Sequence, residues 1–150
     1  MLSRTAEYLY WISRYMERAE TTARLLDVGY RMSLFPNPSG YNNEWESVLS
    51  AAGAIEGYKN KYDTIEQKNV EDYLFFDESN PSSVYNCILN ARNNALVVRT
   101  SFTPESWLAI NKTYQEILNL KEKKFTKSDL PDLTEWTIEQ VNLFRGSLSS

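Results

Sequence analysis

A row of glutamates, arginines and aromatic side chains near the N-terminus holds the groups best suited to binding a charged molecule. Placed around a helix at about 100° per residue, the row gathers on one side, opposite an apolar stripe. Arginine suits such a place because its flat guanidinium pairs with carboxylates or phosphates and stacks on aromatic rings. The candidate binding residues of this row are Glu7, Trp11, Arg14, Glu17, Arg18, Glu20 and Arg24.

Two interpretations of this row stay open. Its acids and bases are spaced three and four residues apart, as Glu20 and Arg24 are, and side chains at that spacing meet on a helix. The row is then a seam of ion pairs, each worth about 0.3–0.5 kcal/mol when exposed. Alternatively it is a face that binds or converts a ligand. Structural ion pairs are common, so the seam is the more frequent explanation of such a pattern.

One long helix over residues 1–35 is needed to position the row. No glycine interrupts this stretch before Gly29, and no proline before Pro36. At 1.5 Å per residue such a helix spans roughly 50 Å, which is the length of a whole domain. Its apolar stripe is predicted to face the core and consists of Leu2, Leu9, Ile12, Met16, Ala19, Ala23, Leu26, Tyr30 and Leu34.

The remainder of the chain predicts further helices and almost no strand. Helical periodicity covers residues 43–55, 64–76, 80–99, 103–121 and 132–144. Thr64, Pro81, Thr103 and Asp132 are predicted to mark helix starts through caps or a proline in the first turn. The fold class is therefore all-α, a bundle of five or six helices packed along the N-terminal helix, with residues 1–150 forming a single domain. Arg92 and Arg99, on the polar side of the helix at 80–99, join the candidate binding residues.

Composition narrows the range of functions. The chain has 150 residues, a net charge of −4 and a pI near 5.0, which argues against a nucleic-acid binder. Its single cysteine, Cys87, cannot form an internal disulfide, which fits a reducing compartment. The sequence holds neither a signal peptide nor an apolar run long enough to cross a membrane. We expect a cytoplasmic protein that binds neither membrane nor nucleic acid.

The chain has no histidine, which removes His-based triads, histidine metal ligands and the commonest general base. The sequence also shows no glycine-rich phosphate loop and no paired nucleophile and base. We expect no cofactor and no metal site. Cys87 lies on an apolar helix side, where packing is the more frequent role of a cysteine.

Two stretches of the sequence resemble the Alpha-E domain family, a bacterial all-helical family named for its Glu-Arg motif. The first runs through Ser3-Arg4-Thr5-Ala6-Glu7, Leu9-Tyr10-Trp11 and Glu17-Arg18-Ala19-Glu20. The second contains Ala91-Arg92-Asn93-Asn94-Ala95 and Trp107-Leu108-Ala109-Ile110-Asn111. Familiar members tend to have glutamate where Asn93 stands, so this chain lacks that carboxylate. The chain resembles the N-terminal half of longer members, and a half-bundle exposes an apolar stripe, so we expect a homo-oligomer.

The resemblance implies a setting for the protein. Alpha-E proteins are encoded with ATP-grasp and transglutaminase-like proteins, in systems thought to make or modify peptides or amide bonds. We expect a binding or scaffold module that serves such a system and contacts an ATP-grasp-type or transglutaminase-like partner. The alternative is an enzyme in which Glu7, Glu17 or Glu20 acts as acid or base and arginines clamp the substrate. No catalytic residue is assigned, and we rank the binding module first.

Overall fold

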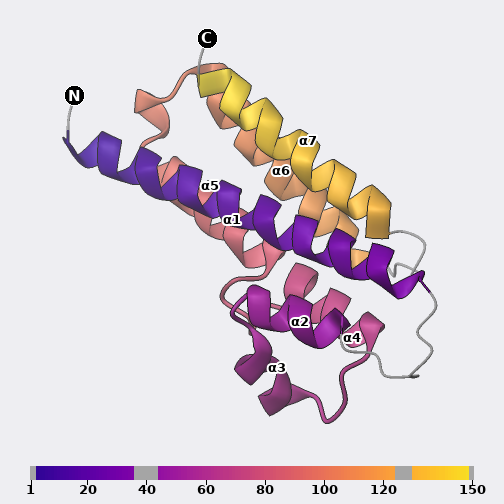
Figure 1. The fold of residues 1–150 in the computed structure, drawn as a ribbon. Helices are drawn as coiled ribbons and strands as arrows, with labels where there is room; N and C mark the ends of the chain where they lie inside the picture. The colour runs from indigo at the N-terminus through magenta and orange to yellow at the C-terminus, as the bar shows by residue number, and fades with distance from the viewer. Residues whose placement is uncertain (1–2, 36–43, 124–129, 149–150) are drawn as a thin grey trace.

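The computed structural model describes residues 3–35, 44–123 and 130–148, and every regular element in these ranges is helical (Figure 1). In chain order the elements are α1 (Ser3–Ser33), α2 (Glu44–Ala51), α3 (Ile55–Lys61), α4 (Gln67–Glu71), a π-helix (Asp72–Phe76), α5 (Val84–Val97), a 3₁₀-helix (Arg99–Ser101), α6 (Pro104–Glu122) and α7 (Leu130–Leu148). The predicted all-α bundle along a long first helix is confirmed. The short helices α3 and α4 bring the α-helices of the described ranges to seven.

Four long helices form the main body of the molecule. α1 packs against α5 on one side and α7 on the other, while α6 packs against both α5 and α7. In Figure 1 α1 and α7 form the front pair and run in opposite directions, with α5 and α6 behind them. The short helices α2, α3 and α4 lie below the C-terminal half of α1. None of the described helices is long and apolar enough to cross a membrane.

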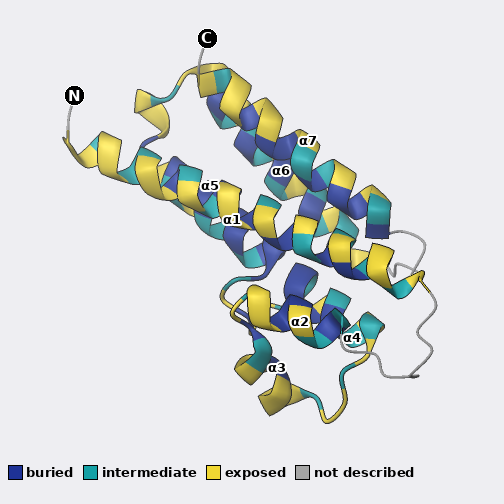
Figure 2. Cartoon of the chain, in the orientation of Figure 1, coloured by how far each residue is buried: buried dark blue, intermediate teal, exposed yellow. Residues whose placement is uncertain are grey.

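Two clusters of buried residues form the core. Figure 2 marks the buried positions along the helices in dark blue. One cluster lies among the four long helices and contains Ile12, Met16 and Phe144. The other lies where the short helices meet α1 and contains Trp45 and Tyr58. The predicted apolar stripe of α1 is confirmed over its middle, where Ile12, Met16, Ala19, Ala23 and Leu26 are buried. Leu34 was wrongly placed in the core, since it lies past the end of α1 and is exposed, and Leu2 falls outside the described residues.

Helix starts were predicted well where the signal is a complete cap. Thr103 caps α6 by accepting a hydrogen bond from the Ser106 amide at 3.2 Å, and Pro104 occupies the first turn, as predicted. The start at Pro81 was wrong, because α5 begins at Val84 with Ser83 as its cap. Residues 80–82 form a turn instead, in which the Asn80 carboxamide oxygen accepts from the Ser82 amide at 3.1 Å.

The other two predicted starts were also wrong. Thr64 does not cap a helix, because its carbonyl accepts a hydrogen bond from the Tyr58 hydroxyl and α4 begins only at Gln67. Asp132 lies inside the first turn of α7, which has already begun at Leu130. A capping pattern in the sequence can therefore be overridden by a contact with another segment, such as the hydrogen bond from Tyr58. Such a contact cannot be recognised from the sequence pattern.

Candidate functional site

The middle of the predicted charged row lies on the outer surface of α1. The Arg14 guanidinium lies 3.4 Å from the Glu17 carboxylate, and the two side chains are 50% and 55% exposed. Beside them Tyr10 and Trp11 are 57% and 48% exposed, with their rings in edge-to-face contact at 5.2 Å between centroids. About half or more of each of these four side chains is exposed in the described structure, so here the row is a surface and not a seam between helices.

Glu20 and Arg24, by contrast, belong to a seam. The Glu20 side chain is only 13% exposed, and its carboxylate accepts from Nε of Arg24 at 2.9 Å, as the helical spacing predicts. A second guanidinium, that of Arg145 on α7, lies 2.9 Å from the other carboxylate oxygen. Glu20 thereby links α1 to α7. Arg145 could not be expected from the sequence pattern, because it lies in the last turn of a helix more than a hundred residues away.

Glu7 and Trp11 line a small groove at the N-terminal end of α1. Arg4 and Tyr8 share this groove, and Asn94 of α5 forms its opposite side, around a volume of about 410 Å³. The Arg4 guanidinium lies over the Tyr8 ring at 5.6 Å. The structure therefore brings together two stretches on which the family resemblance rests, the start of α1 and the middle of α5.

Arg18 lies one helical turn after Arg14, on the same side of α1. It is exposed, and its positive charge acts on the Cys87 thiol of α5. Burial raises the pKa of Cys87 to about 12, and the Arg18 charge only partly opposes this. Because Cys87 is fully buried and its thiol stays protonated at neutral pH, packing explains this residue better than nucleophilic chemistry.

Arg92 and Arg99 do not join the charged row of α1. The Arg92 guanidinium lies against α6, 5.0 Å from the Tyr114 ring centre and 6.0 Å from that of Trp107. Its Nε atom is buried and has no hydrogen-bond partner in the described part of the chain. Arg99 is exposed in the 3₁₀-helix. Among the described residues no three cysteine or carboxylate side chains lie close enough together to hold a metal ion.

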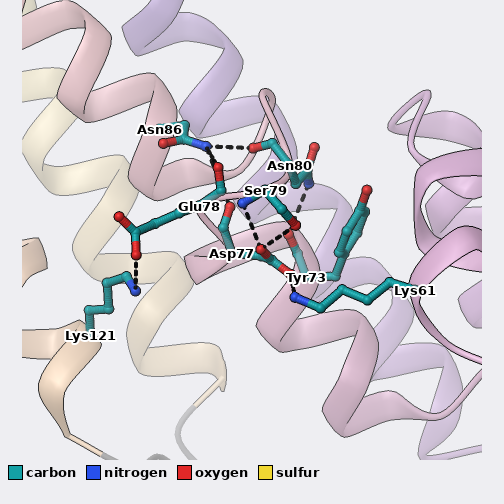
Figure 3. A network of polar contacts seen from close by, with 8 residues as sticks. All are labelled: Lys61, Tyr73, Asp77, Glu78, Ser79, Asn80, Asn86 and Lys121. Atoms are coloured by element: carbon teal, nitrogen blue, oxygen red, sulfur yellow. Dashed lines mark hydrogen bonds and ion pairs between the residues drawn. The ribbon is translucent and has the colours of Figure 1, made fainter.

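A polar network that the sequence did not single out joins α3, α5 and α6 (Figure 3). Asp77 is its centre and accepts hydrogen bonds from Lys61, from the Ser79 amide at 2.7 Å and from the Ser79 hydroxyl at 2.6 Å. Asn86 of α5 donates to the Glu78 carbonyl at 2.9 Å, and Lys121 of α6 lies 3.3 Å from the Glu78 carboxylate. The network fixes the segment between the π-helix and α5.

The ionisation of this network follows from its contacts. Burial by itself would raise the pKa of Asp77, but hydrogen bonds from Lys61 and Ser79 outweigh it and hold that pKa below its usual value. The same contact with Asp77 raises the pKa of Lys61. Asp72, at the edge of the same region, has a pKa raised by burial. Asp77 is thus held as a carboxylate in a structural role.

We expect Asp77→Asn to lower the free energy of unfolding by about 1–3 kcal/mol at neutral pH, because Lys61 and Ser79 lose a charged acceptor. The pKa of Asp77 is lower in the folded state, so its stabilisation is present above the unfolded-state pKa and disappears as pH falls through the folded-state pKa. Urea unfolding at pH 7 and in acid should therefore show a gap between wild type and variant that closes in acid. Asp63→Asn, which changes an exposed carboxylate, is the control; an equal loss there, or a gap independent of pH, contradicts the prediction.

Comparison with known proteins gives one match. The sequence model of the Alpha-E family, described as a predicted alpha-helical domain with a conserved ER motif, matches residues 1–150, the whole chain. Glu17-Arg18 is the only Glu-Arg pair in the sequence, so the motif falls on the exposed middle of α1. No curated protein and no solved structure matches the chain.

Proposed function

The chain belongs to the Alpha-E family, and from this premise we propose that it is a binding or scaffold module that holds a partner on the outer surface of α1. We call this surface the α1 face and define it by Tyr10, Trp11, Arg14, Glu17 and Arg18. The observation that carries the proposal is the exposure of two large aromatic rings beside two arginines. Tyrosine, tryptophan and arginine are the residues most enriched where protein interfaces hold their binding energy.

The chemistry of the α1 face suits an acidic partner. Arg14 makes only a long, exposed ion pair with Glu17, so its guanidinium remains able to form charge-assisted hydrogen bonds with an incoming carboxylate. Arg18 has no ion pair among the described residues. Each guanidinium carries five N–H donors, and the aromatic rings beside the arginines provide surfaces on which a partner's side chain can stack.

The family resemblance supports a setting for this binding. We place the protein in a bacterial, cytoplasmic system that makes or modifies peptides or amide bonds, with an ATP-grasp-type or transglutaminase-like protein as the partner. An acidic segment of either protein, or an acidic peptide passed between them, fits the α1 face.

The enzyme alternative receives less support from the geometry. Two carboxylates separate their pKa values when a dry groove surrounds them, yet the Glu17 side chain is 55% exposed. Glu20 is better shielded, but both its carboxylate oxygens are engaged by Arg24 and Arg145. Such pairing leaves no oxygen of Glu20 aimed at a substrate. The binding module therefore remains the proposed function.

The test is a direct binding measurement with purified proteins. An ATP-grasp-type protein and a transglutaminase-like protein from the same organism are passed over this chain, and over the variant Arg14→Ala/Arg18→Ala. We expect at least one to bind, and the variant to bind about tenfold more weakly or worse, which is about 1.4 kcal/mol. Melting curves should show that the variant stays folded, since both side chains are exposed.

Lys59→Ala/Lys68→Ala is the matched control, because it removes the same charge from exposed positions on α3 and α4. This control should bind as wild type does. The proposal is overturned if neither protein binds, or if both double variants weaken binding equally, which would make the effect one of net charge. Turnover of a small molecule that is lost in Glu17→Gln would instead favour the enzyme.

A further inference from the structure

We propose that the groove between α1 and α7 is the contact surface of a homodimer, in which α1 of each copy lies against α7 of the other. This inference concerns the C-terminal half of α1. It does not depend on the α1 face, which lies on the N-terminal half.

The groove is open and partly apolar. It has a volume of about 850 Å³, and the described residues that line it belong to α1 and α7. Val28 of α1 and Leu143 of α7 line the groove with 50% and 49% of their surface exposed. Ile138 of α7 also lines it. Met32, four residues beyond Val28 on the same side of α1, is 54% exposed. Apolar side chains gathered in this way usually mark a contact surface.

The two edges of the groove carry opposite charges. The α1 edge has Arg24 and Arg31, whose side chains are 58% and 75% exposed and are paired only with acids of α1 itself. The α7 edge has Glu135 and Glu139, both exposed. Neither of these glutamates forms an ion pair within the described residues. Arginines and glutamates on opposite edges therefore form no ion pair with each other inside one molecule, and the glutamates of α7 are left without a basic partner among the described residues.

Symmetry decides how a second copy would sit. α1 and α7 run side by side in opposite directions (Figure 1). A two-fold axis along the groove lays each α1 on the partner's α7 at the same height, so the arginine edge of one copy faces the glutamate edge of the other. A two-fold axis across the groove would instead stack α1 on α1, with arginine facing arginine. The charge pattern favours the first arrangement.

A second copy of the chain supplies oppositely charged partners for both edges of the groove at the same time. In the first arrangement every arginine edge meets a glutamate edge, and this happens twice because the contact is symmetric. Val28, Met32 and Leu143 become buried between the two helix pairs, which supplies the apolar part of the contact. Because the two α1 helices then run in the same direction, both α1 faces end up at the same end of the dimer.

The test reverses the charge of one edge at a time. Sedimentation is measured from about 1 to 100 µM, the range in which weak homodimers form, for wild type, for Arg24→Glu/Arg31→Glu and for Glu135→Arg/Glu139→Arg. We expect wild type to dimerise and each variant to be monomeric, since each puts like charges opposite each other. An equal mixture of the two variants should dimerise again, because both contacts then pair opposite charges.

Two further variants keep the outcome clear. Leu143→Asp leaves every ion pair in place and should abolish the dimer while the monomer stays folded, since this side chain is half exposed. Lys59→Glu/Lys112→Glu makes the same charge change as the α1-edge variant at exposed positions elsewhere and should remain dimeric. A wild type that stays monomeric, edge variants that still dimerise, or a mixture that stays monomeric would each overturn the inference. Occupation of the groove by a different protein would appear as a monomeric wild type.

Discussion

Replacing Trp45 with alanine is expected to lower the free energy of unfolding by about 3–5 kcal/mol. Trp45 is 1% exposed and is the largest of the fully buried side chains. It comes from α2 and packs against α1, so its removal leaves a cavity where the short helices join the main body. Equilibrium unfolding in urea at neutral pH measures the loss, and an unchanged dependence on urea would show that the change lies in the folded state.

Two other tryptophan variants make this prediction specific. Trp45→Phe keeps an aromatic ring in the core and removes an indole N–H that is buried without a partner among the described residues, so its loss should be less than half that of alanine. Trp11→Ala deletes the same atoms from a side chain that is 48% exposed and should change stability by no more than about 0.5 kcal/mol. Equal losses for Trp45→Ala and Trp11→Ala would contradict the proposed position of the core.

The parts of the fold that could be predicted from sequence are those set by neighbours along the chain. The apolar stripe from Ile12 to Leu26 has the period of a helix, and its burial follows from that period alone. The Thr103-Pro104 start of α6 is equally local, because the cap hydroxyl and the backbone amide that donates to it are three residues apart. The failed starts at Pro81 and Thr64 had the right residue types, but Asn80 and Tyr58 held those segments in other conformations.

The candidate site was predicted as one row and is divided in the structure. Helical spacing predicts the direction in which a side chain of α1 points, but it does not predict which residue that side chain contacts. The side chains of Trp11 and Glu17 are about half exposed, whereas the Glu20 carboxylate forms an ion pair with Arg145 of α7. A contact between residues 20 and 145 has no signal in local spacing, so the link between α1 and α7 could not have been predicted.

The ion-pair link between α1 and α7 also lies between most of the residues of the two proposed surfaces. Glu20, Arg24 and Arg145 fasten α1 to α7 near the middle of α1. N-terminal to this link, α1 presents the aromatic and basic α1 face, and C-terminal to it α1 forms an edge of the groove with α7. One helix can thus carry a partner-binding surface toward its N-terminus and a self-association surface toward its C-terminus, with Arg24 belonging both to the ion-pair cluster and to the edge of the groove.

Replacing Gly29 with alanine is expected to destabilise the protein by about 1–3 kcal/mol, although alanine favours a helix over glycine by about 1 kcal/mol. Gly29 lies within α1 where α2 crosses it. A Cβ atom there would lie 2.7 Å from Cζ3 of Trp45 and 2.8 Å from Cγ2 of Val48, closer than real carbon atoms approach. Gly29 therefore allows two helices to come close together, and the added methyl group must push α2 away.

A double-mutant cycle with Trp45→Ala tests this explanation. Two of the three nearest atoms to the added Cβ belong to the Trp45 ring, so Gly29→Ala should cost much less, or even stabilise, once that ring is gone. The coupling energy should fall at about 0.5–3 kcal/mol, the range for residues in contact. Gly146→Ala is the control in α7: nothing lies within 4 Å of its added Cβ, so only helix propensity acts and stability should rise slightly. If Gly29→Ala has the same effect with and without the Trp45 ring, the close approach of α1 and α2 is not what requires glycine.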